Sequence, residues 1–98
     1  MNENLDITVA IPTYNGESRL PELLERLQNQ VNTENLSWEI IVIDNNSTDK
    51  TAKVVQTYQN NWRCPYPLKY CFEAQQGAAY ARKTAVAEAK GRINRFSR

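Results

Sequence analysis

The 98-residue sequence contains no histidine and only two cysteines, Cys64 and Cys71. A structural zinc site needs about four ligands, usually Cys or His, so no zinc site is expected. We expect two reduced, half-buried thiols instead of a disulfide framework. No apolar run approaches the roughly 20 residues that span a bilayer, and the polar start of the chain does not resemble a signal peptide. These features predict a cytoplasmic protein without a transmembrane segment.

Glycine is also scarce, with three residues, and none of them forms a Gly-x-Gly-x-x-Gly turn after the first apolar run. That turn lets the backbone approach a pyrophosphate, so an ordinary dinucleotide-dependent dehydrogenase is excluded. The sequence also lacks a Walker-type phosphate loop and a serine nucleophile elbow. Three common classes of α/β enzyme are therefore not expected.

Charge is distributed unevenly, although the net charge is only +1. Residues 1–49 hold nine acidic and two basic residues, whereas residues 50–98 hold two acidic and ten basic residues. A basic segment can bind phosphate or nucleic acid, but it is equally typical of a solvated helix face. The aromatic residues do not alternate with the basic cluster, as a base-stacking platform requires, so no nucleic-acid partner is expected.

Three short apolar segments, at residues 7–11, 39–43 and 68–72, are predicted strands, and a helical pattern follows each of them. Leucine spacing predicts the first helix over 18–30, with Pro21 in its first turn. Ser47 or Thr48 is expected to cap the second helix. The third helix has an alanine face formed by Ala78, Ala81, Ala85 and Ala89, and we expect Gly91 to end it. The order βαβαβα predicts a Rossmann-like α/β fold around a parallel three-stranded sheet with right-handed crossovers.

Polar residues follow the first two predicted strands where each strand ends. The first turn reads Pro12-Thr13-Tyr14-Asn15-Gly16, and the second runs from Asp44 to Asp49. Ligands bind beyond the carboxyl ends of parallel strands, so the two turns should outline a crevice. Tyr14 offers a ring for base stacking, and Asp44 can accept an N–H from a base edge. Asp44 can equally serve as a turn or helix-capping aspartate.

Three segments, Val9–Asn15, Glu39–Thr51 and Gly77–Arg82, resemble successive motifs of family 2 glycosyltransferases with the GT-A fold. The resemblance extends over residues 7–91 and implies a nucleotide-sugar site, with UDP-sugar as the expected donor. It implies that a nucleotide is bound by Pro12, Thr13, Tyr14, Asn15, Asp44, Asn46 and Arg82. In that assignment Asp44 holds the base, Asn46 shapes the second turn and Arg82 approaches the ribose or diphosphate.

Two positions depart from the family pattern. Asn45 replaces the second aspartate of a common Asp-Asp pair, and Lys83 replaces the asparagine that often follows the arginine. These departures bear on the choice of nucleotide more than on the family.

The resemblance ends where the family's metal-binding aspartates would follow. Those residues hold Mn²⁺ or Mg²⁺ in full-length members, but residues 91–98 contain no acid. One base inserted into a coding stretch for Gly-Glu-Leu-Ile-Gly-Phe-Leu-Asp-Asp reproduces residues 91–98 and then a stop codon. We hypothesise that residues 92–98 are an aberrant basic tail from a frameshift, and this run is not expected to form a central strand.

These observations predict that residues 1–91 form the nucleotide-sugar-binding half of a GT-A domain. The chain is expected to lack a metal site and catalytic residues, and to be a truncated glycosyltransferase that is inactive alone. A stand-alone nucleotide-binding or regulatory module is the alternative. Half a sheet also leaves an open edge, so self-association through that edge is expected.

Overall fold

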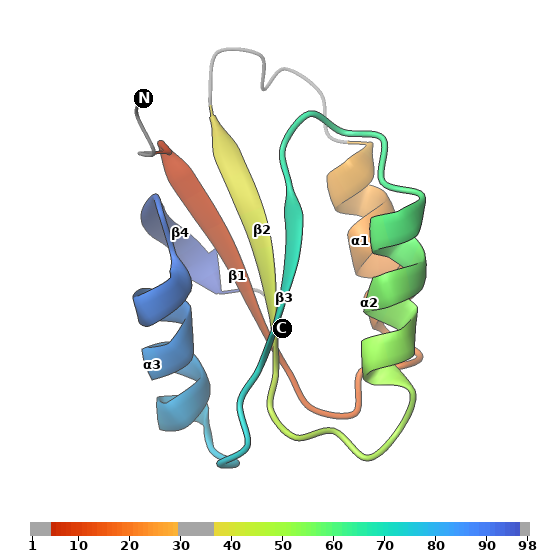
Figure 1. The fold of residues 1–98 in the computed structure, drawn as a ribbon, viewed down its shortest axis with the longest axis vertical. Coiled ribbons are helices and arrows are strands. Elements are labelled where there is room, and N and C mark those ends of the chain that lie inside the picture. The colour runs from red at the N-terminus through yellow and green to blue at the C-terminus, as the bar shows by residue number, and fades with distance from the viewer. Residues whose placement is uncertain (1–4, 30–36, 97–98) are drawn as a thin grey trace.

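The computed structural model describes residues 5–29 and 37–96, which form a sheet with helices on both faces (Figure 1). The elements follow the order β1 (Ile7–Thr13), α1 (Leu20–Gln28), β2 (Trp38–Asp44), α2 (Thr51–Asn60), β3 (Leu68–Phe72), α3 (Ala78–Glu88) and β4 (Arg92–Phe96). Pro21 lies in the first turn of α1, as predicted. No helix of this part of the chain is long and apolar enough to cross a bilayer.

The sheet is parallel throughout and has the strand order β3-β2-β1-β4. The pairing of β1 with β2 runs from Ile7 opposite Trp38 to Thr13 opposite Asp44. The parallel α/β architecture predicted from the sequence is therefore confirmed. The expectation of a three-stranded sheet is wrong, because residues 92–96 add a fourth strand.

The fourth strand forms because β1 has a second edge available to any backbone that can approach it. Gly91 permits that approach, since a Cβ there would lie 2.9 Å from the backbone N and C of Ile7. The role expected for Gly91 at the helix end is thus wrong: α3 ends at Glu88, and the extended Ala89 is its cap. Polar residues are tolerated in β4 because it is an edge strand of this sheet.

Two apolar clusters hold the helices against the sheet. On one face, Leu20 and Leu24 of α1 and Val55 of α2 pack against alternate residues of β1 and β2. On the other face, α3 contributes Ala81 and Ala85, whose small side chains let the helix lie close to the strands. The predicted alanine face is thus correct at its centre, while Ala78 is exposed. All seven residues of β2 are buried, as expected for a central parallel strand.

One carboxylate, that of Glu39, is fully buried on the α3 face near the amino ends of the strands. It accepts hydrogen bonds from the Thr8 hydroxyl and the Lys90 N–H, both at 2.7 Å, and forms an ion pair with Lys69 at 2.7 Å. Burial by itself raises the pKa of Glu39, but these three partners outweigh it and hold the pKa below 4.5. The Gly91 N–H donates to Thr8 Oγ1 at 3.0 Å, so the network joins β1, β2 and β3 to the segment before β4.

Candidate nucleotide site at the carboxyl ends of the strands

The carboxyl ends of three strands lie side by side. Thr13 of β1, Asp44 of β2 and Phe72 of β3 are opposite one another in the strand register. Strand alternation places all three on the sheet face that α1 and α2 cover. The turns that follow β1 and β2 therefore begin next to each other, as the sequence predicted.

Side chains of the second turn hold the first turn in place. The Asn15 N–H donates to Ser47 Oγ at 2.8 Å, and the Thr48 N–H donates to Asn15 Oδ1 at 2.8 Å. The buried Gly16 N–H donates to Thr51 Oγ1 at 2.9 Å. The prediction that Ser47 or Thr48 caps α2 is wrong, because α2 begins at Thr51 without a side-chain cap. These two residues bond to the first turn instead.

Asp49 strengthens the same connection. Its carboxylate accepts hydrogen bonds from the N–H groups of Glu17 at 3.1 Å and Thr51 at 3.0 Å, and from the Thr51 hydroxyl. Desolvation opposes its ionisation, but these bonds hold the pKa of Asp49 below its ordinary value. The residue remains negatively charged beside the amino end of α2, where a negative charge is favourable.

Asp44 is 3% exposed, and both of its carboxylate oxygens have partners. Oδ1 accepts the Ser47 N–H at 3.0 Å, and Oδ2 accepts the Tyr70 hydroxyl at 2.6 Å. Burial and then the Asp44 carboxylate raise the pKa of Tyr70 above its ordinary 10.0. Asp44 thus acts as a turn aspartate, which was one of the two roles open to it; its contact with a base remains a prediction.

Asn45 connects the second turn to the segment before α3. Its amide nitrogen donates to the carbonyls of Glu73 at 3.3 Å and Gln75 at 2.7 Å, while its oxygen accepts the Gly77 N–H at 2.9 Å. An aspartate could not donate these two bonds and would place a negative charge against two carbonyl oxygens. The departure from the common Asp-Asp pair therefore has a structural reason in this chain.

Asn46 bends the second turn with a φ of 61°, and Asn15 has a φ of 50° in the first turn. Asparagine adopts this left-handed backbone conformation more readily than most residues. The Asn46 amide donates to the Ala74 carbonyl at 3.1 Å, and Gln76 donates back to the Asn46 carbonyl at 3.1 Å. These bonds join the second turn to the segment before α3, and the nucleotide-site role of Asn46 stays a prediction.

The structure thus brings the predicted residues Pro12, Thr13, Tyr14, Asn15, Asp44 and Asn46 to one edge of the sheet. Tyr14 is 48% exposed there, so its ring is accessible for stacking. Arg82 lies on the second turn of α3, after the loop that Asn45 and Asn46 hold.

Sequence reasoning missed Tyr70 and Gly77 as partners of the second turn. Tyr70 precedes Phe72 by two positions, and alternation along β3 places its side chain on the same face as Asp44. The alternation of Tyr70 and Phe72 is visible in the sequence, but it points to Asp44 only when the pairing of β3 with β2 is known. Gly77 has a φ of 137°, a conformation that glycine adopts most readily, but its bond to Asn45 crosses 32 positions and has no local signature.

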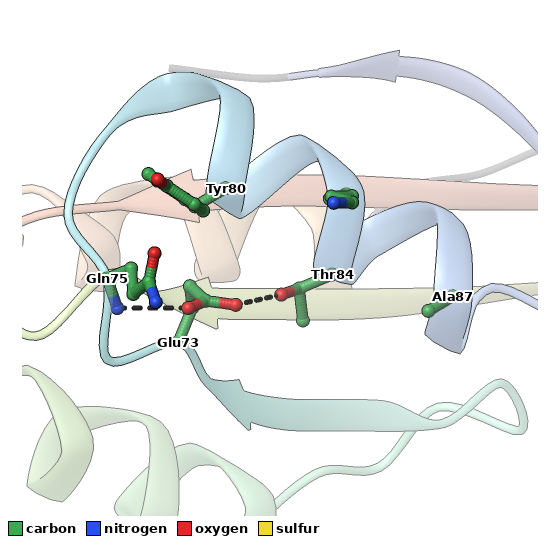
Figure 2. Close-up of a pocket in the computed structure, with 6 residues that line it drawn as sticks. Glu73, Gln75, Tyr80, Thr84 and Ala87 are labelled. Carbon is green, nitrogen blue, oxygen red and sulfur yellow. Dashed lines mark hydrogen bonds between the residues drawn. The ribbon is translucent and has the colours of Figure 1, made fainter.

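An open depression of about 390 Å³ lies beside α3, outside the predicted nucleotide site (Figure 2). It is lined by Glu73, Gln75, Tyr80, Lys83, Thr84 and Ala87. The Glu73 carboxylate accepts hydrogen bonds from the Thr84 hydroxyl and, at 2.9 Å, from the Gln75 N–H. These bonds, the Thr84 bond first, lower the pKa of Glu73. Glu73 therefore fixes the start of α3 relative to β3.

The described residues do not fit a metal site. No group of three or more His, Cys, Asp or Glu side chains converges anywhere within residues 5–29 and 37–96. The acids that follow the strand ends, Asp44, Asp49 and Glu73, are all held by hydrogen bonds within the fold. We therefore derive no chemical step from a metal held by these residues.

A comparison with known protein families identifies the family of this chain. The family model described as Glycosyl transferase family 2 matches residues 8–96. The chain belongs to this family. Family 2 members transfer sugars from nucleotide sugars, and the resemblance noted in the sequence motifs is thereby confirmed.

This chain matches only part of the length of its curated relatives. Dolichyl-phosphate beta-glucosyltransferase ALG5D of Trichomonas vaginalis is 33% identical over 74% of this chain and 24% of its own. Abequosyltransferase RfbV of Salmonella typhimurium is 42% identical over 60% of this chain and 17% of its own. The chain therefore spans about a quarter or less of the length of these two relatives.

Solved structures share the fold at recognisable sequence identity. Staphylococcus aureus TarS 1-349 in complex with UDP has a TM-score of 0.78 and 30% identity, over 95% of this chain and 27% of that one. The mannosyltransferase PcManGT of Pyrobaculum calidifontis, in complex with GDP-Man and Mn²⁺, has a TM-score of 0.76 and 29% identity, over 88% of this chain and 25% of that one. The parallel α/β sheet thus matches part of a GT-A fold.

Proposed function

We propose that this chain binds the nucleotide of a UDP-sugar at the carboxyl ends of β1 and β2, and that it does not transfer the sugar by itself. One observation carries the proposal: the two turns are bonded into a single rigid edge from which Tyr14 projects, 48% exposed. The TarS structures determined with UDP and with UDP-GlcNAc support this choice of ligand.

In this proposal, the chemistry of each side chain determines its role in binding the nucleotide. Tyr14 stacks on the uracil ring, since any base presents a flat π-face to an aromatic side chain. Pro12, Thr13 and Asn15 form the wall of the pocket, and Asn46 keeps the second turn clear of it. Arg82 pairs with the ribose or diphosphate side, because a guanidinium matches the geometry of phosphate oxygens.

Asp44 has a double role in this proposal. Its bonds to Ser47 and Tyr70 position the second turn. Each carboxylate oxygen accepts more than one hydrogen bond, so the same group can also accept the N–H of the base. Loss of Asp44 is therefore expected to weaken both folding and binding, and it is a poor first test of the binding role alone.

Tyr14→Ala is the sharper test, and Tyr80→Ala is its matched control. Both tyrosines are about equally exposed, at 48% and 45%, but Tyr80 lines the separate depression beside α3. In calorimetric titration with UDP, we expect Tyr14→Ala to weaken binding about tenfold or more and Tyr80→Ala to leave it unchanged. Equal affinities for the wild type and Tyr14→Ala would contradict the site, as would a wild-type chain that does not bind UDP.

Absence of transfer is the second part of the proposal. A family member needs a carboxylate base to activate the acceptor hydroxyl and, commonly, a divalent cation against the diphosphate. We propose that those groups are encoded beyond a frameshift that produced residues 92–98, and that Mn²⁺ or Mg²⁺ binds only in the full-length protein. Turnover of a radiolabelled UDP-sugar by the 98-residue chain would refute the inactivity but not the nucleotide site.

The adjoining DNA tests the frameshift directly. The proposal predicts an acidic motif and an acceptor domain in the neighbouring frame after codon 91. Without them, the chain is instead a stand-alone nucleotide-binding module.

We also propose a cytoplasmic location, because Cys64 and Cys71 are free thiols and a reducing compartment keeps them so. Fractionation of expressing cells checks this placement.

A further inference from the structure

β3 is an edge strand of the sheet that residues 5–29 and 37–96 form, and its outer edge has a defined hydrogen-bonding phase. The Pro67 carbonyl accepts the Ile40 N–H at 3.0 Å, and the Glu73 N–H donates to the Asp44 carbonyl at 2.8 Å. Odd-numbered residues of this strand therefore face β2, and the N–H and C=O groups of the even-numbered residues Tyr70 and Phe72 point outward. The Leu68 carbonyl also faces outward and is occupied by the Gln59 amide at 3.0 Å.

The sequence along this edge is self-complementary. It reads Lys69-Tyr70-Cys71-Phe72-Glu73, with opposite charges at equal distances from Cys71. A two-fold axis through Cys71 places Lys69 of one copy opposite Glu73 of the other. It also places Tyr70 opposite Phe72. Aromatic cross-strand pairs stabilise antiparallel strands, whereas Lys69 is already paired with Glu39 and the Glu73 carboxylate with Thr84.

The hydrogen-bonding phase agrees with this register. Tyr70 and Phe72 both point their backbone groups outward, so they can exchange two N–H···O=C bonds on each side of the axis. Cys71 then falls at a non-hydrogen-bonded position. A register shifted by one residue, centred on Tyr70, would place Phe72 opposite Leu68, whose outward carbonyl is already occupied by the Gln59 amide.

We propose that two copies of this chain associate through their β3 edges, antiparallel about a two-fold axis at Cys71, to form one continuous sheet. Phe72 is 54% exposed in the single chain, and the pairing would cover it. Figure 1 shows α1 and α2 on one side of the sheet and α3 on the other. This interface goes beyond the proposed nucleotide site, and the two sites of such a dimer would open toward opposite ends of the sheet.

Cys71 provides a direct probe of the register. Opposed Cα atoms at a non-hydrogen-bonded antiparallel position are about 4.5 Å apart, within the range of a disulfide. Diamide oxidises two such thiols to one disulfide and takes up both hydrogens itself as it is reduced to a hydrazine. Burial, followed by the Glu88 charge, raises the pKa of the Cys71 thiol, so the reaction is run at mildly alkaline pH.

The cysteine variants separate the two thiols. Cys64 packs against the opposite sheet face and donates to the Gln28 carbonyl at 3.2 Å, so Cys64→Ser is the matched control. We expect a covalent dimer from the wild type and Cys64→Ser, and none from Cys71→Ser. A cross-link that requires Cys64, or no cross-link in a chain that sediments as a dimer, would overturn the proposed register.

Sedimentation equilibrium tests the edge itself under reducing conditions. Phe72→Pro removes an outward N–H that β2 does not use, and proline is tolerated at such edge positions. Phe72→Ala keeps that N–H and is its control. Because the two-fold axis doubles each lost bond, we expect dimerisation to weaken about tenfold more in Phe72→Pro than in Phe72→Ala.

Amide hydrogen exchange keeps the test decisive if Phe72→Pro does not fold. In the wild type, protection of the Tyr70 and Phe72 N–H groups should increase with protein concentration. A monomer at every concentration, or protection that rises only in β4, would refute association through β3.

Discussion

The side-chain oxygen of Asn45 accepts a hydrogen bond from the backbone N–H of Gly77 at 2.9 Å. This bond joins the turn after β2 to the segment before α3, across 32 positions of the chain. The same side chain donates two bonds to carbonyls of that segment. This amide therefore helps to position the start of α3, and with it Arg82.

Asn45→Asp should destabilise the fold by about 2–4 kcal/mol, because two donated bonds are lost and a buried carboxylate faces carbonyl oxygens. Urea unfolding measures the change. Asn46→Gly is the control: its position has a φ of 61°, which glycine tolerates, and its exposed amide makes one bond, so we expect a loss below about 1 kcal/mol. Equal losses in the two variants would show that the Asn45 bonds are not important.

Glu39→Gln should destabilise the fold by about 3 kcal/mol at neutral pH, because it leaves Lys69 without its buried partner. The pKa of Glu39 is lowered in the folded state, so the stabilisation is fully present above pH 4.5 and is lost as the pH falls through the folded pKa. The difference between wild type and variant should therefore shrink in acid. Glu22→Gln, in an exposed ion pair with Arg26, should change stability by less than about 1 kcal/mol at either pH.

Tyr70→Phe should cost about 1–2 kcal/mol, since it removes the hydroxyl that donates to Asp44. The pKa of Tyr70 is raised in the folded state, so this contribution is fully present below pH 10.0 and declines as the pH rises toward the folded pKa. Unfolding curves across alkaline pH should converge for the two proteins. Tyr80→Phe, at an exposed position, should unfold as the wild type does.

Gly91→Ala should destabilise the fold by about 1–3 kcal/mol, because the new methyl group would lie 2.9 Å from the Ile7 backbone and 3.0 Å from the Leu5 carbonyl oxygen. The loss should be concentrated at the β1–β4 pairing. Hydrogen exchange should accelerate in β4 before it does in β2. Uniform acceleration in all strands would contradict a local effect.

Much of the fold could be predicted because its signals are local. The β-branched runs located β1 and β2 within two residues at each end, alternation located β3, and leucine spacing located α1. β4 was missed because a polar edge strand has no apolar pattern, and its pairing depends on the bare backbone at Gly91. The ion pair of Glu39 with Lys69 was also missed, since its partners come from different strands.

The candidate site was predictable in place but not in its internal bonds. Because the carboxyl ends of parallel strands meet at one edge of a sheet, the sequence predicted that Tyr14, Asp44 and Asn46 lie at that edge. It could not show that Asp44 is already bonded by Ser47 and Tyr70, because that depends on which face of β3 each side chain occupies. Ser47 and Thr48 read as helix caps locally, while the fold uses them to bind the neighbouring turn.

The strand order also constrains how the protein is made. β1 leaves the ribosome before the other three strands, yet it lies between β2 and β4. One side of β1 therefore stays unpaired until β4 has been synthesised, and closing it requires contacts between residues more than 80 positions apart, such as Thr8 and Ile93. Such non-local pairing is slow, and until it forms, the unpaired backbone edge of β1 can associate with other chains. We therefore expect chaperones to bind the nascent chain until β4 emerges and pairs with β1.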